Sequence, residues 1–333
     1  MEKVLVAGAG GRLGGAVLGE LKKRGYRTRA LLRDGARAEG SCTPVGEVFT
    51  GDARRAVTLG GVCEGVGVVI SALGASLRLG RTGGGGNYRD VDFRANLNLL
   101  ECARVAGARK FVYVSLHGAE HLRGLAYVDA HEEFVEALRA SGLDYTVVRP
   151  TGFFYIFEEI FKMAERGRVV LVGAGGARTN PVHEEDVARE CADAVEVGER
   201  ELSVGGPETY TRREIAELAF AALGREPKVS SLPPRLVRAL LRPVRLFDQR
   251  LYDFCAFGVA VSTTDLVAPP AGRRSFRRYF EQLAGGGPGP ASDLLDSRER
   301  ERRVSTAELR IPSELRRSGE LRRSKGAVRW PEM

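Results

Sequence analysis

The sequence predicts an α/β fold in which a doubly wound parallel sheet is followed by a smaller C-terminal region and a charged tail. Three observations support this. Short apolar segments alternate with amphipathic helical segments over the first 150 residues. Glycines follow the first apolar segment directly, at a place where such sheets turn from strand into helix. Beyond residue 284 the chain becomes glycine- and proline-rich and then strongly charged, which is typical of a segment without a core.

The first predicted strand, residues 3–7, runs into a glycine turn and an amphipathic helix. The glycines stand at Gly8, Gly11 and Gly14, a G-x-x-G-x-x-G spacing. They permit a tight turn, allow a pyrophosphate to approach backbone N–H groups, and let the helix pack closely on the strand. Leu13 stands where a G-x-G-x-x-G spacing would need glycine. The turn predicts a dinucleotide site, with a glycine-rich turn that binds nothing as the alternative.

The elements that follow continue the alternation of strands and helices up to Pro150. We expect strands at residues 26–32, 47–50, 67–74, 110–115 and 145–149, and helices at 90–106 and 129–141. Strands separated by helices of this length imply right-handed crossovers and a parallel sheet covered on both faces. Residues 1–150 therefore form the predicted dinucleotide-binding domain.

Residues 151–283 are predicted to form a cap or substrate region that partly returns to the sheet. Its first helix is aromatic and carries Phe153, Phe154 and Tyr155. We expect these rings on the rim of a cleft, where they would suit a flat apolar substrate, with packing inside the cap as the alternative. Further elements are expected at 168–172, 184–197 and 211–223, the last opened by a capping box.

The end of the chain carries two basic segments. Residues 234–247 combine four arginines with leucines and could touch a membrane surface. Pro243 interrupts the segment, so the sequence favours an amphipathic helix packed on the cap with its arginines in water. Residues 284–333 are predicted to be a linker and a disordered charged tail, in which a contact with something acidic is the alternative to a solvated segment.

The composition of the 333 residues limits the function classes. The formal charge of +8 is spread over the whole length with no basic stripe interleaved with aromatic residues, so no nucleic-acid partner is expected. The five cysteines are scattered without a C-x-x-C pair, which predicts neither a disulfide framework nor a zinc site. No apolar run is long enough for a signal-peptide core or a membrane span. We expect a cytoplasmic protein with a small-molecule substrate, and its oligomeric state stays open.

Five segments of the chain are familiar as a set. They are GAGGRLG at 8–14, VDFRANLNLL at 91–100, FVYVS at 111–115, GLDYTVVRP at 142–150 and NPVHEED at 180–186. Together they resemble the atypical short-chain dehydrogenase/reductase superfamily, of the NmrA-like kind, over about residues 1–280. The resemblance implies a Rossmann sheet extended past six strands and a C-terminal region that closes over a cleft at the strand ends.

The resemblance also implies catalytic residues. In that superfamily a serine ends the fifth strand, a tyrosine follows about twelve residues later, and a lysine stands four residues beyond it. Ser115 and Tyr127 match, whereas His131 takes the lysine position and Asp92 stands where many relatives carry asparagine. A lysine charge favours the phenolate and lowers the tyrosine pKa, but a histidine is mostly neutral at pH 7. The usual proton transfer by Ser115, Tyr127 and His131 is therefore left open.

The cofactor is predicted from the end of the second strand. NAD binders usually place an acidic side chain there and NADP binders an arginine, and this chain has Arg33 followed by Asp34. Arg12 in the glycine turn adds positive charge, so NADP is predicted, with NAD as the alternative. By resemblance Asp52 would flank the adenosine, and for it a helix N-cap is the alternative. The complete cofactor set is Gly8, Gly11, Arg12, Leu13, Gly14, Arg33, Asp52, Leu73, Gly74, Ser115, His131 and Pro150.

Three functions are compatible with these features. The leading one is an NADPH-dependent oxidoreductase for a small, flat, apolar carbonyl, enone or quinone-like acceptor, because hydride transfer depends mainly on positioning. The second is a redox sensor of the NmrA type that binds NAD(P) without turnover. The third is a sugar-nucleotide epimerase or dehydratase. The missing lysine favours the sensor and weakens the epimerase, whose chemistry begins with oxidation of an alcohol.

Overall fold

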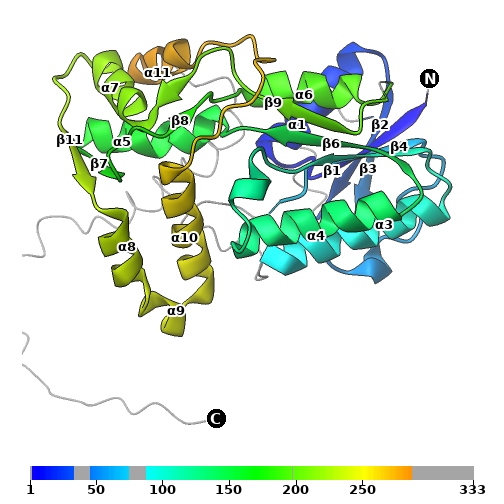
Figure 1. Ribbon diagram of the computed structural model, residues 1–333. Helices are drawn as coiled ribbons and strands as arrows, with labels where there is room; N and C mark the ends of the chain where they lie inside the picture. Colours follow the sequence, from blue (N-terminus) through cyan, green and yellow to red (C-terminus); the bar gives the residue numbers. More distant parts are fainter. Residues whose placement is uncertain (1, 34–45, 75–87, 197, 287–333) are drawn as a thin grey trace, which may run out of the picture. The chain divides into compact units, whose positions relative to one another are not determined.

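The predicted parallel sheet is present in the computed structural model, which describes residues 2–33, 46–74, 88–196 and 198–286 (Figure 1). Within these residues the sheet has seven strands in the order β3-β2-β1-β4-β5-β6-β9, and every neighbouring pair is parallel. The strands are β1 (Lys3–Ala7), β2 (Arg27–Leu32), β3 (Glu47–Thr50), β4 (Val68–Ser71), β5 (Lys110–Val114), β6 (Asp144–Pro150) and β9 (Glu201–Val204). The order reverses direction at β1 and β4, the place where parallel sheets bind ligands.

Helices cover both faces of the sheet (Figure 1). Along β1 the side chains alternate, so that Val4 and Val6 pack on one face while Leu5 and Ala7 pack on the other. Apolar side chains of α1 (Arg12–Lys23) and α6 (Glu184–Asp193) belong to the first core, and those of α3 (Ala95–Val105) and α4 (Ala126–Ala140) to the second. Two cores of this kind hold the strand ends, and the loops that follow them, in fixed positions.

The region after Pro150 builds a core of its own and then returns to the sheet. Its strand β7 (Val169–Val172) pairs in parallel with β11 (Val229–Leu232), and β8 (Arg178–Thr179) pairs antiparallel with β10 (Tyr210–Thr211). The surrounding helices are η4 (Phe154–Phe157), α5 (Glu158–Glu165), α7 (Arg212–Ala222) and α11 (Phe276–Ala284). Aromatic rings from these helices fill the cap core. Strand β9 then adds to the main sheet beside β6.

Three helices project from the cap as a hairpin: α8 (Pro234–Leu241), α9 (Val244–Phe247) and α10 (Gln249–Thr263) (Figure 1). The sequence predicts an amphipathic helix packed on the cap with its arginines in water; the four arginines are exposed as predicted, but the packing is only partial. No residue of α8 or α9 is buried, and Leu240, Leu246 and Phe247 are 65%, 83% and 90% exposed. The chain reverses at α9, directly after Pro243, so the side chains at the turn face outward instead of meeting a second layer.

Several predicted boundaries differ from the structure. The segment expected as a helix from about residue 90 begins with a π-helical stretch, η2 (Arg89–Arg94), before α3. Helix α4 begins at Ala126, three residues before the predicted start, so Tyr127 lies inside its first turn. Single-turn 3-10 helices occur at η1 (Ala56–Thr58) and η3 (Ala119–His121). Among the described residues no helix is both long and apolar enough to cross a bilayer. Apart from residues 284–286, the predicted tail lies outside the described residues.

Candidate functional site

The glycine turn lies between the ends of β1 and β4. Gly8 has a positive φ of 79°, and a Cβ there would come within 2.5 Å of the Ala72 carbonyl oxygen. A Cβ on Gly14 would stand 2.6 Å from the Gly8 carbonyl carbon. The Gly11 N–H donates to the Gly8 carbonyl at 2.9 Å, and Gly11 then caps α1 without any side-chain hydrogen bond. The first N–H groups of α1 are therefore not satisfied by a side-chain cap, and this geometry fits a pyrophosphate.

Arg12 and Leu13 follow the turn but point in different directions. Leu13 is buried in the core between α1 and the sheet, so its side chain packs inside the protein and does not face a bound cofactor. The Arg12 guanidinium donates to Glu158 Oε1 at 2.9 Å and lies 4.9 Å from the centre of the Tyr155 ring. The Tyr279 hydroxyl donates to the same Glu158 oxygen at 2.7 Å. Arg12 thus joins the glycine turn to the cap.

The expected ribose and phosphate residues gather at the ends of β2 and β3. Arg33 directly follows β2 and is exposed, while Asp34 lies outside the described residues. Asp52 follows β3, and both of its oxygens accept hydrogen bonds from the Arg54 guanidinium at 2.6–3.1 Å. Asp52 also accepts the Arg54 backbone N–H at 3.1 Å, so it closes a local turn and does not cap a helix. The Arg54 hydrogen bonds lower the pKa of Asp52, and the charge of Arg33 acts in the same direction.

Leu73 and Gly74 follow β4 and lead to His131. A Cβ on Gly8 would lie 3.0 Å from the Leu73 nitrogen, and one on Gly74 would lie 3.5 Å from Asp92 Oδ1. Asp92 Oδ1 in turn lies 3.6 Å from His131 Nε2. The predicted cofactor residues of the glycine turn, of the loop after β4 and of helix α4 therefore lie next to one another at the carboxyl ends of the strands.

His131 is a buried, neutral histidine. Its ring is 3% exposed, its Nδ1 shares a 2.6 Å hydrogen bond with the Tyr113 hydroxyl, and its Nε2 has no hydrogen-bond partner among the residues that the structure describes. Burial lowers the pKa of His131 to about 4, because taking a cation out of water is unfavourable. At pH 7 this residue does not supply the positive charge that the lysine supplies in the superfamily.

Tyr127 is half-buried among aromatic rings. Its ring makes edge contacts with Tyr88, His131 and Phe257, at centroid distances of 5.4, 4.7 and 4.9 Å. Burial raises the pKa of the Tyr127 phenol well above its ordinary value, and the charge of Asp92 raises it further. The phenol therefore keeps its proton at any working pH.

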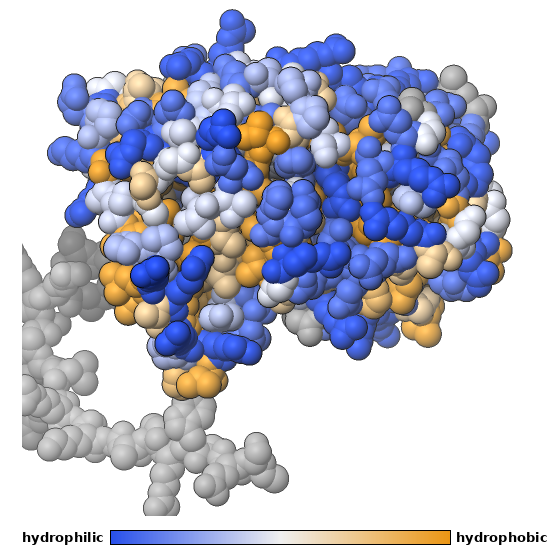
Figure 2. Space-filling model, in the orientation of Figure 1, coloured by the Kyte–Doolittle hydropathy of each residue, from blue (hydrophilic) through white to orange (hydrophobic). Residues whose placement is uncertain are grey.

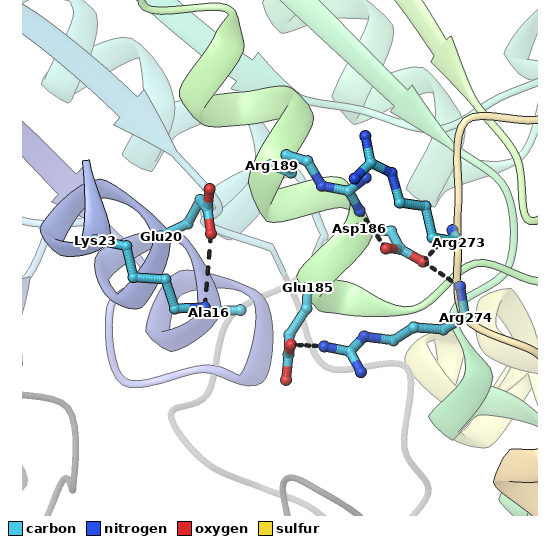
Figure 3. Close-up of a pocket in the computed structure, with 8 residues that line it drawn as sticks. All are labelled: Ala16, Glu20, Lys23, Glu185, Asp186, Arg189, Arg273 and Arg274. Atoms are coloured by element: carbon cyan, nitrogen blue, oxygen red, sulfur yellow. Dashed lines mark hydrogen bonds and ion pairs between the residues drawn. The ribbon is translucent and has the colours of Figure 1, made fainter.

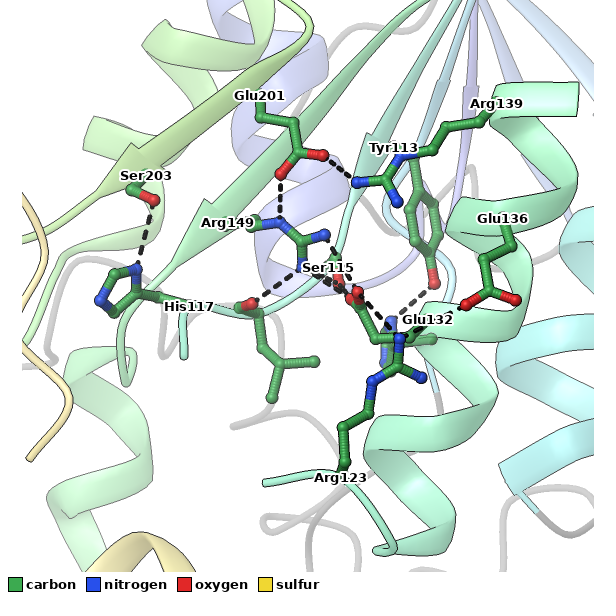
Figure 4. A network of polar contacts seen from close by, with 12 residues as sticks. Tyr113, Ser115, His117, Arg123, Glu132, Glu136, Arg139, Arg149, Glu201 and Ser203 are labelled. Atoms are coloured by element: carbon green, nitrogen blue, oxygen red, sulfur yellow. Dashed lines mark hydrogen bonds and ion pairs between the residues drawn. The ribbon is translucent and has the colours of Figure 1, made fainter. Parts of the chain in front are cut away.

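Ser115 belongs to a buried ionic network at the ends of β5 and β6 (Figure 4). Its hydroxyl donates to Glu132 Oε1 at 3.1 Å and accepts from Arg149 at 3.3 Å. Arg149 holds both Glu132 oxygens, at 2.6 and 3.1 Å, and also donates to Glu201 at 3.0 Å. Ser115 is thus engaged within the protein. Pro150, at the end of β6, accepts the His117 N–H at 2.9 Å.

The three aromatic residues predicted to line the cleft are placed differently. The Phe153 and Tyr155 rings are partly exposed and stack at 5.3 Å with an interplanar angle of 8°. Phe154 is 1% exposed and packs against His183, Phe276 and Tyr279 inside the cap. Phe153 and Tyr155 therefore lie beside Arg12 and the glycine turn, whereas Phe154 belongs to the cap core.

A cavity of about 340 Å³ opens elsewhere, between α1, α6 and residues 273–274 (Figure 3). None of the predicted site residues lines it, and its walls hold ion pairs between Arg189 and Asp186 and between Arg274 and Glu185. Asp186 also accepts the backbone N–H groups of residues 273 and 274. Ion pairs engage most of the charged side chains of this cavity, so its visible role is to tie the returning chain to α6.

Sequence reasoning missed the residues that hold the site together. They are Arg54, Tyr113, Glu132, Arg149 and Glu158, none of which was assigned a role. Tyr113 and Arg149 lie within the familiar segments, and Glu132 follows the lysine position directly. A signal was present for Arg149 alone: an arginine inside an apolar strand needs a buried acidic partner.

Comparisons with known proteins agree with this geometry. A family model described as NAD(P)H-binding matches residues 8–197. A chloroplastic divinyl chlorophyllide a 8-vinyl-reductase of Zea mays is 32% identical over 257 residues, which cover 72% of this chain and 63% of the relative. The chain thus spans less than two thirds of that relative's length. A photosystem II assembly factor of Trieres chinensis is 24% identical over 260 residues, covering 76% of this chain and 80% of the relative.

One solved structure shows the same fold over most of the chain. It is an NADPH-dependent quinone oxidoreductase of Escherichia coli in complex with NADPH, with a TM-score of 0.63 and 22% identity, covering 90% of this chain and 99% of that one. The family model covers more than half of the 333 residues, beginning at Gly8 of the glycine turn. The chain therefore belongs to the NAD(P)H-binding family, and the resemblance of its motifs to the atypical short-chain reductases is confirmed.

Proposed function

We propose that this chain is an NADPH-dependent reductase that delivers hydride to a flat, apolar, conjugated acceptor, such as a quinone, an enone or a vinyl-substituted macrocycle. The state of His131 carries the proposal. At the position of the superfamily's lysine the chain has a buried imidazole with a pKa of about 4. Tyr127 therefore keeps its proton, and the site lacks the base that oxidation of an alcohol requires.

A conjugated acceptor needs little from the protein beyond positioning. When bound, NADPH supplies the hydride. The glycine turn and the open N terminus of α1 would hold the pyrophosphate. The acceptor takes hydride at carbon, its charge spreads onto oxygen or over the conjugated system, and a proton from water completes the reduction. Tyr127, which stays protonated, can donate a hydrogen bond to that oxygen.

The shape of the acceptor is inferred from the cleft rim. Phe153 and Tyr155 present a stacked, partly exposed aromatic surface beside Arg12. Such a surface favours a planar ring system through stacking and apolar contact. The named substrates of the relatives, a divinyl chlorophyllide and a quinone, are also conjugated. We therefore extend the acceptor class to include macrocycles.

Preference for NADPH over NADH is part of the proposal and rests on Arg33 and Arg54. Both arginines act on Asp52, the acidic residue that would otherwise repel a 2′-phosphate. We expect Arg33→Ala and Arg54→Ala each to weaken NADPH binding by about tenfold and to leave NADH binding within about twofold. A fluorescence titration measures both constants. Equal affinities for the two cofactors in the unaltered chain would contradict the preference.

The reductase activity is tested with the purified chain, NADPH and a panel of quinones, enones and divinyl chlorophyllide. We expect NADPH oxidation with at least one of these acceptors. Tyr127→Phe should keep at least about a third of the turnover, because water can supply the proton. Tyr26→Phe is the matched control, since the Tyr26 hydroxyl bonds Glu196 on the surface. A hundredfold loss confined to Tyr127→Phe would show that Tyr127 is an essential acid.

A redox sensor that binds NADPH without turnover is the second candidate. The neutral His131 also favours it, since turnover is not needed for sensing. One relative carries the name of an assembly factor. Micromolar NADPH binding without oxidation by any acceptor would make this candidate the better one. The epimerase candidate is weakest, because its first step needs the phenolate that this site disfavours.

A further inference from the structure

The helical hairpin ends in an exposed apolar tip. Leu246 and Phe247 on α9, at the turn, are 83% and 90% exposed, and Leu236 and Leu240 on α8, the helix that leads to the turn, are 49% and 65% exposed. Figure 2 shows hydrophobic residues gathered at the far end of the projection, beyond a band of hydrophilic residues. Exposed apolar side chains are ordinary when single, but a group at the end of a projection indicates a binding surface.

Five arginines lie along the hairpin that ends in this tip. Arg235, Arg238, Arg242 and Arg245 are exposed and Arg250 is half-buried. Among the residues that the structure describes, none of the five forms an ion pair, and Arg245 lies 5.7 Å from the centre of the Tyr252 ring. These cations are therefore available to an anionic partner.

The two acidic residues of the hairpin are already engaged. Asp248 accepts the Leu251 N–H at 2.9 Å and so caps α10, and Asp253 accepts from the Gln249 side chain at 2.7 Å. Asp253 also feels the charge of Arg245. Five arginines against two aspartates leave residues 234–263 with a net charge of +3, so the projection combines an apolar end with an excess of positive charge.

We propose that the hairpin docks this protein on an anionic membrane surface. Leu246 and Phe247 enter the boundary between headgroups and acyl chains, and the arginines bind lipid phosphates around them. Stable peripheral binding needs two signals, an apolar insertion and a basic patch, and this hairpin carries both. The long arginine side chains can lie along the apolar surface while their charges reach the phosphates.

The same hairpin reaches the candidate site. Helix α10 runs back from the tip to α4, where the Phe257 ring lies 4.9 Å from the Tyr127 ring. An apolar acceptor dissolved in the bilayer would therefore meet the site close to the membrane. This connection rests on the proposed function, whereas the docking itself does not and is tested without any acceptor.

Insertion of the tip is tested by fluorescence in the full-length chain. Trp330 is the only tryptophan, so the background variant is Trp330→Phe, into which Phe247→Trp is introduced. We expect its emission to shift to the blue and to be quenched by brominated lipid on vesicles of phosphatidylcholine and phosphatidylglycerol. Val57→Trp in the same background is the control, since Val57 is 86% exposed and lies outside the hairpin. An unshifted Phe247→Trp spectrum on bound protein would overturn the proposal, because binding would then come from another segment.

The apolar signal is measured by vesicle sedimentation. We expect the double variant Leu246→Ser and Phe247→Ser to lower partitioning onto anionic vesicles by at least about tenfold. NADPH binding should be unchanged, which shows that the variant is folded. Unchanged partitioning would overturn the proposal. The proposal would also be overturned if the protein self-associates in sedimentation velocity without vesicles and the same substitutions abolish that self-association. The tip would then be a contact between two copies of the chain.

The basic signal is measured in the same way. We expect the triple variant Arg238→Gln, Arg242→Gln and Arg245→Gln to lower partitioning by about fivefold per charge, and added salt to act in the same direction. The matched control carries Arg55→Gln, Arg166→Gln and Arg278→Gln, which remove the same charge from exposed positions outside the hairpin. Equal losses in the two variants, or equal binding to phosphatidylcholine alone, would overturn the anionic specificity. If the protein binds anionic vesicles but oxidises NADPH with none of the acceptors, only the proposed reductase activity is contradicted and the membrane docking stands.

Discussion

Gly14→Ala tests whether the glycine turn is built as the structure shows. The new Cβ would overlap the Gly8 carbonyl oxygen and stand 2.6 Å from its carbon and 2.9 Å from Ala9 Cα. All three atoms belong to the backbone, so no side chain can yield. Restoring the 3.4 Å of an ordinary contact to the carbon requires α1 and the turn to separate by about 0.8 Å. Overpacking of this size costs about 1–3 kcal/mol of unfolding free energy.

The displaced turn also loses hydrogen bonds to a pyrophosphate, so we expect NADPH binding to weaken by about tenfold or more. Thermal unfolding with and without NADPH, together with a fluorescence titration, measures both effects. Gly15→Ala and Gly19→Ala are controls on the same helix. Within the described part of the chain, a Cβ at Gly15 would meet nothing closer than 3.9 Å, and one at Gly19 would meet nothing within 4 Å. Gly19→Ala should stabilise the helix by about 0.5–1 kcal/mol. A Gly14→Ala protein that melts and binds like Gly15→Ala would refute this account of the turn.

Three further predictions concern buried or half-buried charge. The pKa of His131 in the folded protein is about 4, below the ordinary value of 6.5. The neutral, buried His131 therefore adds to the unfolding free energy above pH 6.5, and this contribution is lost as the pH falls towards 4. The loss amounts to about 3 kcal/mol, and urea unfolding across this range should show it in the unaltered chain but not in His131→Phe. Arg149→Met should lower the unfolding free energy by about 3 kcal/mol because it removes the bidentate partner of the buried Glu132 and leaves it the Ser115 hydroxyl and the Arg123 guanidinium at 4.0 Å, and adding Glu132→Met should restore most of the loss. Glu158→Gln should tighten NADPH binding at least about threefold by releasing Arg12 to the phosphates, and unchanged binding would show that Arg12 does not reach them.

The parts of the fold that the sequence predicts are those in which one local signal dominates. Six strands of the sheet and the turn at Gly8 follow from apolar runs that end in glycine or polar residues. Resemblance implies a sheet extended past six strands, but the position of the seventh strand, Glu201–Val204, and the cap strand Val229–Leu232 were not predicted. Each has four residues and mixes polar with apolar side chains, and both are partly exposed. Their pairing depends on neighbours that are distant in sequence, so no local pattern reveals it.

The sequence predicts where the site residues stand along the chain, but it does not predict which side chains contact one another. Periodicity places His131 correctly on its helix, and resemblance gives Tyr127 its spacing from Ser115 and His131, but the predicted helix begins two residues after Tyr127, whereas in the structure Tyr127 lies in its first turn. They do not show that Arg12 turns towards Glu158 or that Ser115 is held by Glu132. Both partners come from other parts of the chain, and a charged residue on a helix is by default interpreted as solvated. Long-range ion pairs of this kind are the part of the site that only three-dimensional structure reveals.

The arrangement of charges in the site has one consequence for the direction of its chemistry. The permanent cation nearest to Ser115 is Arg149, and it could in principle replace the missing lysine. Its guanidinium, however, is bonded to both oxygens of Glu132 and to Glu201, so little of its positive field remains for a phenolate. His131 is neutral, and Asp92 opposes ionisation of Tyr127. A site with these charges disfavours removal of a proton from an alcohol, whereas addition of hydride to a conjugated acceptor makes no such demand.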